Sequence, residues 1–303
     1  MNYEEALMAK VSWYYYIEGM TQQNISELLG ISRMKVIKLL DKARESGIIQ
    51  FSICKREEKR MSIENNLRDK FKLRDAFVVP TNPVEAETNE TISKAAAMYI
   101  FDRISKDDFI NIGYGDTTGR VLNNLAEMTD SPVSCVSLTG GVNCYLLNHP
   151  RVFNANLYLI PAPLIVSSTE IASQIKSENA VQEIERMASH SKMTVLGIGG
   201  VKEDATIVKS GLIGKNDLVY LQMQGAVGDI LSHFIDENGK TVNAEIEGRL
   251  ISYELEKVKE LNNVIGVAAG GSKLEAIRAA LLGEYLDVLI TDEETAEKLI
   301  NTP

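Results

Sequence analysis

Three short segments of the chain combine glycine with hydroxyl or charged side chains, as loops that bind anions do. They lie at 113–118, 139–141 and 270–273, and their candidate ligand contacts are Gly115, Asp116, Thr117, Thr118, Thr139, Gly140, Gly141 and Lys273. Glycine lets backbone amides approach a phosphate, hydroxyl groups add donors, and a lysine adds a fixed positive charge. The set predicts a site for a phosphorylated ligand, although each segment alone also fits a tight β-to-α turn.

A fourth polar segment, GAVGDILSHFIDENGK at 225–240, places Asp229 between Gly228 and Ile230. A carboxylate at this position could accept hydrogen bonds from sugar hydroxyls, or it could cap the N-terminus of a helix that follows. The sequence leaves both roles open. The residues DENG at 236–239 predict a plain turn.

The other reactive side chains do not have the spacing of a catalytic or metal site. They stand apart in the sequence as His149, His190, His233, Cys54, Cys135 and Cys144. We therefore expect no catalytic residue, no metal and no cofactor, and the few cysteines suit a reducing compartment. The alternative is a phosphosugar isomerase or deaminase with a helical appendage, in which Asp116 or Asp229 would serve as the base.

A sheet must position these segments. Apolar runs alternate with helical patterns after residue 74, and we expect strands in AFVVP, FINIGYG, SCVSLTG, LYLIPAP, MTVLGIG, LVYLQM, NVIGVAAG and DVLITD. This alternation predicts an α/β fold with a mainly parallel sheet. Ligands of such sheets bind beyond the carboxyl ends of the strands, where the glycine segments fall.

The first 50 residues predict three short helices, which end near Gly19, Gly30 and Gly47, with Thr21 and Ser32 as N-caps of the second and third. The side chains that we expect to face inward are Leu7, Val11, Tyr14 and Ile17, then Ile25, Leu28 and Leu29, then Val36, Leu39, Leu40 and Ala43. IIQFSI at 48–53 alternates like a strand. The pattern predicts a winged helix-turn-helix whose wing ends in the basic run CKREEKR.

The third helix turns a polar face away from its apolar stripe, as a DNA recognition helix does. The expected DNA-binding residues are Thr21 and Gln22 near phosphate, Ser32 at the helix start, and Arg33, Met34, Lys35 and Lys38 in the major groove. A three-helix scaffold with a solvated charged face is the alternative.

The net charge of -10 hides an uneven distribution. Residues 1–60 hold ten Lys/Arg against eight Asp/Glu, and residues 61–303 hold 22 against 34, or -12. Within the first segment, residues 30–60 hold nine basic and four acidic side chains, a local +5. A basic patch on an acidic body fits DNA binding. The acidic N-terminus and the absence of an apolar run of about 18 residues lead us to expect a cytoplasmic protein.

The segment YYYIEGMTQQNISELLGISRMKVIKLLDKARESGII resembles the N-terminal module of SorC-family bacterial transcriptional regulators, and it departs from the family's usual SRPTVSRLL mainly at Met34, Lys35 and Ile37. GYGDTTG, SLTGG, IPAPL, VLGIGG, DATIVKSG, GAVGDI and AAGGSKLEAI resemble, in the same order, the sugar-binding domain of that family. The resemblance covers nearly all of the chain. Within the family it is similar to Lsr-type repressors of autoinducer-2 uptake and to sorbose or sorbitol operon regulators.

The resemblance implies a winged helix-turn-helix at 1–55, a connecting helix at 56–74 and a phosphosugar isomerase-like effector domain at 75–303. Family ligand contacts fall on the candidates named above, on Asp229 and on Asn154. Some members have a longer loop before the lysine, whereas Lys273 follows Gly271 after one residue. We expect a homo-oligomeric, often tetrameric, repressor that binds operator DNA. Its effector would be a phosphorylated sugar or phosphorylated autoinducer-2.

Overall fold

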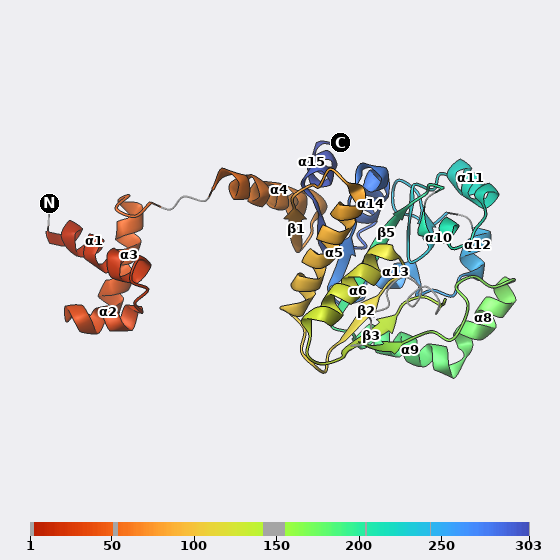
Figure 1. Ribbon diagram of the computed structural model, residues 1–303, viewed down its shortest axis with the longest axis horizontal. Helices are drawn as coiled ribbons and strands as arrows, with labels where there is room; N and C mark the ends of the chain where they lie inside the picture. Colours follow the sequence, from red (N-terminus) through yellow and green to blue (C-terminus); the bar gives the residue numbers. More distant parts are fainter. Residues whose placement is uncertain (1–2, 51–53, 142–154, 204, 243, 303) are drawn as a thin grey trace. The chain divides into compact units, whose positions relative to one another are not determined.

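The computed structural model (Figure 1) describes residues 3–50, 54–141, 155–203, 205–242 and 244–302. The chain divides into two compact units, Met1–Glu58 and Lys59–Pro303. In the described part, no helix is both long and apolar enough to cross a lipid bilayer.

The N-terminal unit contains three helices, α1 (Tyr3–Tyr16), α2 (Gln22–Leu29) and α3 (Arg33–Glu45). The Thr21 side chain accepts the Asn24 N–H at the start of α2, and the Ser32 side chain accepts the Lys35 N–H at the start of α3. Gly30 ends α2 in the left-handed conformation, as expected for a C-cap. The helices enclose one apolar core, formed by Met8, Val11, Ile25, Val36, Leu39, Leu40 and Ala43.

Two expectations for the first 60 residues are wrong, and a third is tested only in part. Ile17 lies beyond the end of α1 and is 66% exposed, and Leu28 on α2 is 57% exposed, so neither belongs to the core. Residues 48–50 form no strand, and 51–53 lie outside the described residues. The basic run that was expected to end a wing instead begins α4 (Lys55–Phe71), because its residues continue directly into a helix.

The larger unit is built on a sheet whose seven parallel strands follow the order β1-β9-β8-β5-β2-β3-β4. Their bounds are β1 Asp75–Val79, β2 Phe109–Ile112, β3 Val133–Ser137, β4 Ala155–Tyr158, β5 Met193–Gly200, β8 Val264–Val267 and β9 Val288–Asp292. The predicted α/β class is confirmed. An antiparallel hairpin of β6 (Gly228–Ile230) and β7 (His233–Ile235) pairs with the end of β5.

Helices cover both faces of the sheet (Figure 1). One apolar core lies under α5 (Glu85–Phe101) and α6 (Asp116–Met128), which pack side by side. The other lies under α4, α9 (Asn179–His190), α14 (Leu274–Leu282) and α15 (Glu293–Asn301). The remaining helices are α8 Thr169–Ser177, α10 Thr206–Lys209, α11 Lys215–Met223, α12 Ala244–Arg249 and α13 Leu255–Val258.

Two local predictions in this unit are wrong. LVYLQM at 218–223 is part of α11 and not a strand, because Leu218 and Leu221 are buried at helical spacing while Val219 and Tyr220 between them are exposed. The helix expected after Asp229 is a hairpin, so Asp229 caps no helix. The turn predicted at 236–239 is present, with the Asn238 and Lys240 N–H groups donating to the Asp236 side chain.

Strand β1 is at one edge of the sheet, and α4 covers that edge. Ile63 and Leu67 of α4 share a core with Ala76 and Val78 of β1. The Glu64 carboxylate accepts the Val78 N–H at 2.8 Å, which occupies one of the donors of the free edge. Because this carboxyl is half-buried, its pKa is raised.

Candidate functional site

The polar face of α3 is open to solvent, in contrast to its buried stripe. Arg33, Met34, Lys35 and Lys38 are all exposed, and Met34 is 61% exposed. Thr21 is exposed as well, and Gln22 is half-buried at the start of α2. The cap bonds fix the first turns of α2 and α3, so this arrangement presents two helix N-termini and three cations. It has the form of a helix-turn-helix that can meet phosphates and base edges.

Not every cation of α3 belongs to that face. Lys42 Nζ lies 2.7 Å from Glu4 Oε1, and the pair links α3 to α1. The hydrogen bond with Lys42 lowers the pKa of Glu4, and the same bond raises the pKa of Lys42. Lys42 is therefore less suited to a phosphate than Lys35 or Lys38.

In the larger unit, residues from three of the four predicted segments approach the glycine-rich end of β5. A methyl group added to Gly197 would lie 3.6 Å from Thr118 Cγ2. One added to Gly199 would lie 2.0 Å from Asp229 Oδ1, and one added to Gly200 would lie 4.0 Å from Lys273 Cγ. The absence of side chains on β5 thus makes room for residues from three different segments. We refer to this region, Gly197–Gly200 with Thr118, Asp229 and Lys273, as the β5 junction.

Asp229 lies in β6 and its carboxylate stands over Gly199. Burial raises its pKa from 3.8 to about 6, although the Ser232 N–H, Lys273 and His233 each act to lower it. The Ser232 N–H donates to Asp229 Oδ2 at 3.2 Å. Burial makes the ionised form of this carboxylate costly in free energy. A ligand that donates hydrogen bonds to the carboxylate would lower this cost.

The turn that follows Asp229 is strained, and two contacts with other segments hold it. Leu231 and Ser232, which join β6 to β7, have φ of 53° and 68°, in the region that favours glycine. The Ser252 hydroxyl donates to the Leu231 carbonyl at 2.9 Å. The Leu231 side chain is buried against Gly113, where a methyl group would approach it to 2.9 Å. The surrounding structure therefore imposes the position of Asp229.

Helix α6 contributes its N-terminus, but its threonines face inward. Thr117 and Thr118 are buried, and the Thr118 hydroxyl lies 2.8 Å from the Gly113 carbonyl and 2.9 Å from that of Gly115. Asp116 Oδ2 accepts from Arg120 Nε at 2.8 Å. The structure thus gives Thr118 a role in holding the loop, and Gly115 and Asp116 are the half-exposed groups at this helix start.

The loop after β3 differs from the expected amide cradle. The Gly140 N–H donates to the Ile251 carbonyl and the Gly141 N–H to the Ala162 carbonyl, both at 2.8 Å. Thr139 is 1% exposed. These two amides are used within the chain, so they are not directed at a ligand. The remaining candidate of this region, Asn154, lies outside the described residues.

Lys273 follows a tight loop at the end of β8. Gly270 has φ of 102° and donates its N–H to Thr295 Oγ1 at 2.9 Å. Lys273 ends the short 3-10 turn Gly271–Lys273 and is half-buried. Its charge opposes part of the rise that burial causes in the pKa of Asp229.

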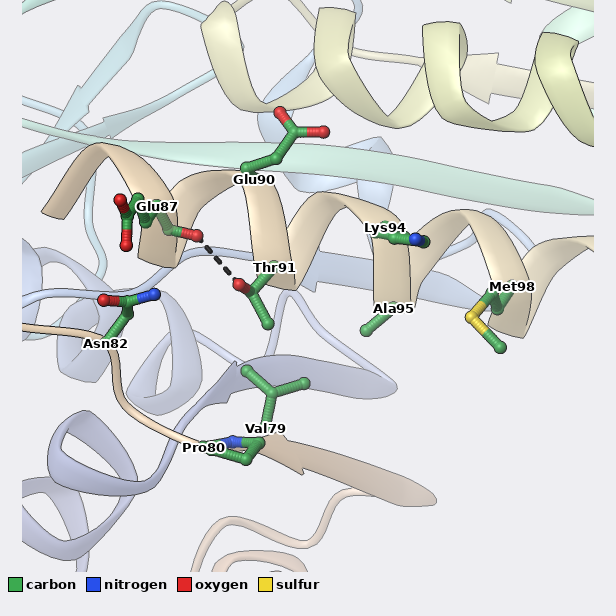
Figure 2. Close-up of a pocket in the computed structure, with 9 residues that line it drawn as sticks. All are labelled: Val79, Pro80, Asn82, Glu87, Glu90, Thr91, Lys94, Ala95 and Met98. Carbon is green, nitrogen blue, oxygen red and sulfur yellow. Dashed lines mark hydrogen bonds between the residues drawn. The ribbon is translucent and has the colours of Figure 1, made fainter. Parts of the chain in front are cut away.

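A cavity of about 450 Å³ lies elsewhere, between α5 and β1 (Figure 2). The apolar side chains of Val79, Ala95 and Met98 line its centre. Lys94 is its one cation, whereas Glu87 and Glu90 are acidic. None of the described effector candidates lines it. We prefer the β5 junction as the ligand site, because an acidic, apolar groove does not favour a phosphate.

The described histidines serve structure. His233 is buried, with Nδ1 2.7 Å from Glu247 Oε1 and Nε2 2.9 Å from the Tyr253 carbonyl oxygen. These two contacts fasten β7 to α12 and to the chain at Tyr253. Within the described ranges there is no group of three His, Cys, Asp or Glu side chains that could hold a metal ion.

Sequence reasoning did not assign a role to Gly197, Gly199 or Gly200. The signal was available, because glycine within a strand often marks a close approach by other groups. Ser252 and Thr295 were missed as well, and no local pattern distinguishes them, since their partners are 21 and 25 residues away.

Residues 55–301 match the family described as "Putative sugar-binding domain". The chain is 35% identical to the transcriptional regulator LsrR of Klebsiella pneumoniae, over 98% of this chain and 93% of that protein. It is 36% identical to LsrR of Escherichia coli K12, over 99% and 96%. It is similar in structure to the full-length sorbitol operon regulator SorC of K. pneumoniae, with a TM-score of 0.70 and 26% identity, over 99% of this chain and 100% of that chain.

Proposed function

Since this chain belongs to the SorC family of sugar-binding transcriptional regulators, we propose that it is a repressor whose operator affinity is controlled by a phosphorylated sugar bound at the β5 junction. Its relatives are regulators and not enzymes, which sets aside the isomerase alternative. The observation that carries the proposal is the convergence of Lys273, Asp229 and the α6 N-terminus on the glycine-rich end of one strand.

The chemistry of the junction suits a phosphorylated polyhydroxy compound. Lys273 and the N-terminus of the 13-residue α6 both favour an anion. Asp229 accepts hydrogen bonds and would orient hydroxyl groups. Because Gly199 and Gly200 have no side chains, Asp229 and the Gly270–Lys273 loop can approach β5 closely. Phosphorylated autoinducer-2 and sorbitol- or sorbose-type phosphates share this chemistry. The similar SorC structure is that of a sorbitol operon regulator, and the sequence resemblance to Lsr-type repressors points to autoinducer-2.

The DNA side of the proposal is carried by α3. Arg33, Lys35 and Lys38 would enter the major groove together with Met34, while Thr21, Gln22 and Ser32 lie at helix starts where backbone amides meet phosphates. We further propose a cytoplasmic homo-oligomer, a dimer or tetramer, because one small helical module makes few DNA contacts.

Effector and operator would compete through conformational linkage. If the effector favours an arrangement that DNA disfavours, each weakens the binding of the other by the same factor. Couplings of about 1–3 kcal/mol are typical, or roughly 5- to 150-fold in affinity.

The test is a fluorescence anisotropy titration of the protein with DNA from upstream of its own gene. It is repeated with sorbitol 6-phosphate, sorbose 1-phosphate, phosphorylated autoinducer-2 and the unphosphorylated parent of each. We expect one phosphorylated compound to weaken DNA binding at least about fivefold. Equal DNA affinity with all of them would contradict the proposal.

Two variants locate the sites. Lys273→Ala should lose the response to the active compound and keep its DNA affinity. The matched control is Lys94→Ala, which changes a lysine in the groove of Figure 2.

The double variant Lys35→Ala with Lys38→Ala should weaken DNA binding and reduce its salt dependence. Lys42→Ala should weaken DNA binding less, because the Lys42 side chain is paired with Glu4.

A further inference from the structure

Helix α15 connects the β5 junction to the helix that leads toward the DNA-binding unit. Its first turn holds the loop after β8, because buried Thr295 accepts the Gly270 N–H at 2.9 Å. A methyl group added to Gly271 would also lie 3.6 Å from Lys298 Nζ. A displacement of Gly270 would therefore break a hydrogen bond to α15.

The other side of α15 is fastened to α4. Arg60 Nε lies 3.3 Å from Glu293 Oε1, and the two side chains are only 16% and 24% exposed. Lys59 Nζ lies 2.6 Å from Glu297 Oε1, in a more exposed pair. The partly buried pair carries more weight, since solvent screens exposed pairs to about 0–1 kcal/mol.

The far end of α4 is tied to α15 as well. Lys70 Nζ donates to the Leu299 and Ile300 carbonyls at 3.2 and 3.0 Å. Leu299 shares one apolar core with Leu67 of α4. The two helices are thus joined along their lengths, and a shift of α15 would be passed to α4 as a unit.

A half-satisfied carboxylate lies where α15 begins. Asp292 is 2% exposed, its Oδ2 accepts from the Thr81 hydroxyl, and its Oδ1 has no hydrogen-bond partner among the described residues. A buried acceptor left unpaired costs free energy, so a displacement of this helix start that brought a donor to Oδ1 would be favoured by the new bond.

We propose that α15 transmits the state of the Gly270–Lys273 loop to α4, with Thr295 and the Arg60–Glu293 pair as positioning residues. The direction of control over DNA rests on the proposed function. The mechanical link itself is a property of the ligand-free chain and can be tested without an effector or an operator.

The test is amide hydrogen exchange of the intact chain in its wild-type, Thr295→Val and Thr295→Ser forms. Valine keeps the shape and removes the acceptor of the Gly270 N–H, while serine keeps that acceptor. We expect Thr295→Val to raise exchange in peptides covering 55–63 at least about threefold, and Thr295→Ser to restore it. Peptides from β2 and β3 serve as the control for general destabilisation. Faster exchange confined to 268–274 would overturn the link.

A second arm uses Arg60→Glu, Glu293→Arg and their combination, which restores the pair with reversed charges. Each single variant should raise exchange at 55–63, and the double variant should return it toward wild type. Equal exchange profiles in all three variants would overturn the role of the pair.

A separate measurement adds inorganic phosphate to the wild type. If phosphate did not slow exchange at 268–274, this would count against the proposed phosphate site. The Thr295 variants would still test the link between the Gly270–Lys273 loop and α4.

Discussion

The loop after β3 and the β5 junction contain similar residues and treat their polar groups in opposite ways. In the loop after β3, the amides of Gly140 and Gly141 are bonded to carbonyls of the chain. At the β5 junction, Asp229 is held by a left-handed turn in a place where ionisation is costly. A segment whose polar groups are all bonded within the chain serves the packing of the protein. A segment that holds a polar group at a cost in free energy is the better candidate for a ligand site, because a ligand that bonds to this group lowers the cost.

The largest effect that separates the two regions is expected from Gly140→Ala. The new methyl group would lie 2.5 Å from the Pro163 carbonyl oxygen and 2.8 Å from that of Ala162. Backbone atoms cannot move aside cheaply, so we expect the free energy of unfolding to fall by about 3 kcal/mol. Urea unfolding followed by circular dichroism measures it.

The matched control is Gly197→Ala at the β5 junction, where the nearest atom would be 3.6 Å away and stability should hardly change. A Gly140→Ala protein with wild-type stability and no effector response would reverse the comparison, because the loop after β3 would then be the ligand loop.

Asp229→Asn should reveal the cost of the carboxylate. Its raised pKa of about 6 means that between about pH 4 and pH 6 the folded chain keeps a proton that the unfolded chain loses. The resulting stabilisation is full below about pH 4 and is lost as the pH rises through 6. Relative to wild type, the Asn variant should therefore gain stability as the pH rises, by about 3 kcal/mol in all above about pH 7, because one pKa unit corresponds to about 1.4 kcal/mol. Urea unfolding at about pH 5 and pH 8 measures the gap, and a pH-independent gap would argue against buried charge.

Thr118→Val tests whether buried threonines act by holding loops. The variant removes the hydroxyl that lies against the Gly113 and Gly115 carbonyls, so we expect a loss of about 1.5 kcal/mol. Thermal and urea unfolding measure the loss, and Thr118→Ser should recover most of it. If the valine variant were as stable as wild type but unresponsive to effector, Thr118 would be a ligand contact instead.

The smallest effect, and the only gain from relieved backbone strain, is expected from Ser232→Gly. Glycine adopts a φ of 68° without the penalty of a side chain, and the buried Ser232 hydroxyl has no hydrogen-bond partner in the described part of the chain. We expect a gain of about 1 kcal/mol in urea unfolding. Ser232→Ala removes the hydroxyl and keeps the strained φ, so it should gain less. An equal gain from both variants would assign the cost to the hydroxyl and not to the backbone.

Sequence was a good guide where structure depends on near neighbours. The caps at Thr21, Gly30 and Ser32 and the stripe of α3 follow from interactions within four residues, and the structure confirms them. Most of the parallel strands also follow from apolar runs, which can be recognised without their partners, although their order in the sheet was not predicted. The roles of the individual DNA and effector contacts stay predictions.

Sequence failed where distant residues decide. The hairpin at Asp229 turns on Leu231 and Ser232, which carry none of the Asn or Gly signals of such a turn, because tertiary contacts impose it. The amides of Gly140 and Gly141 bond to the carbonyls of Ile251 and Ala162, which are 111 and 21 residues away in the sequence. Glycine content alone cannot distinguish an occupied amide from one offered to a ligand.

Because α4 covers the edge strand β1, the position at which the chain is truncated affects the behaviour of the fragment. A fragment that began at residue 75 would lose Ile63, Leu67 and the Glu64 bond to Val78, and it would present an open strand edge with apolar surface beside it. Such edges invite pairing between chains. A recombinant sensor fragment should therefore retain all of α4, from Lys55, to remain monodisperse in solution.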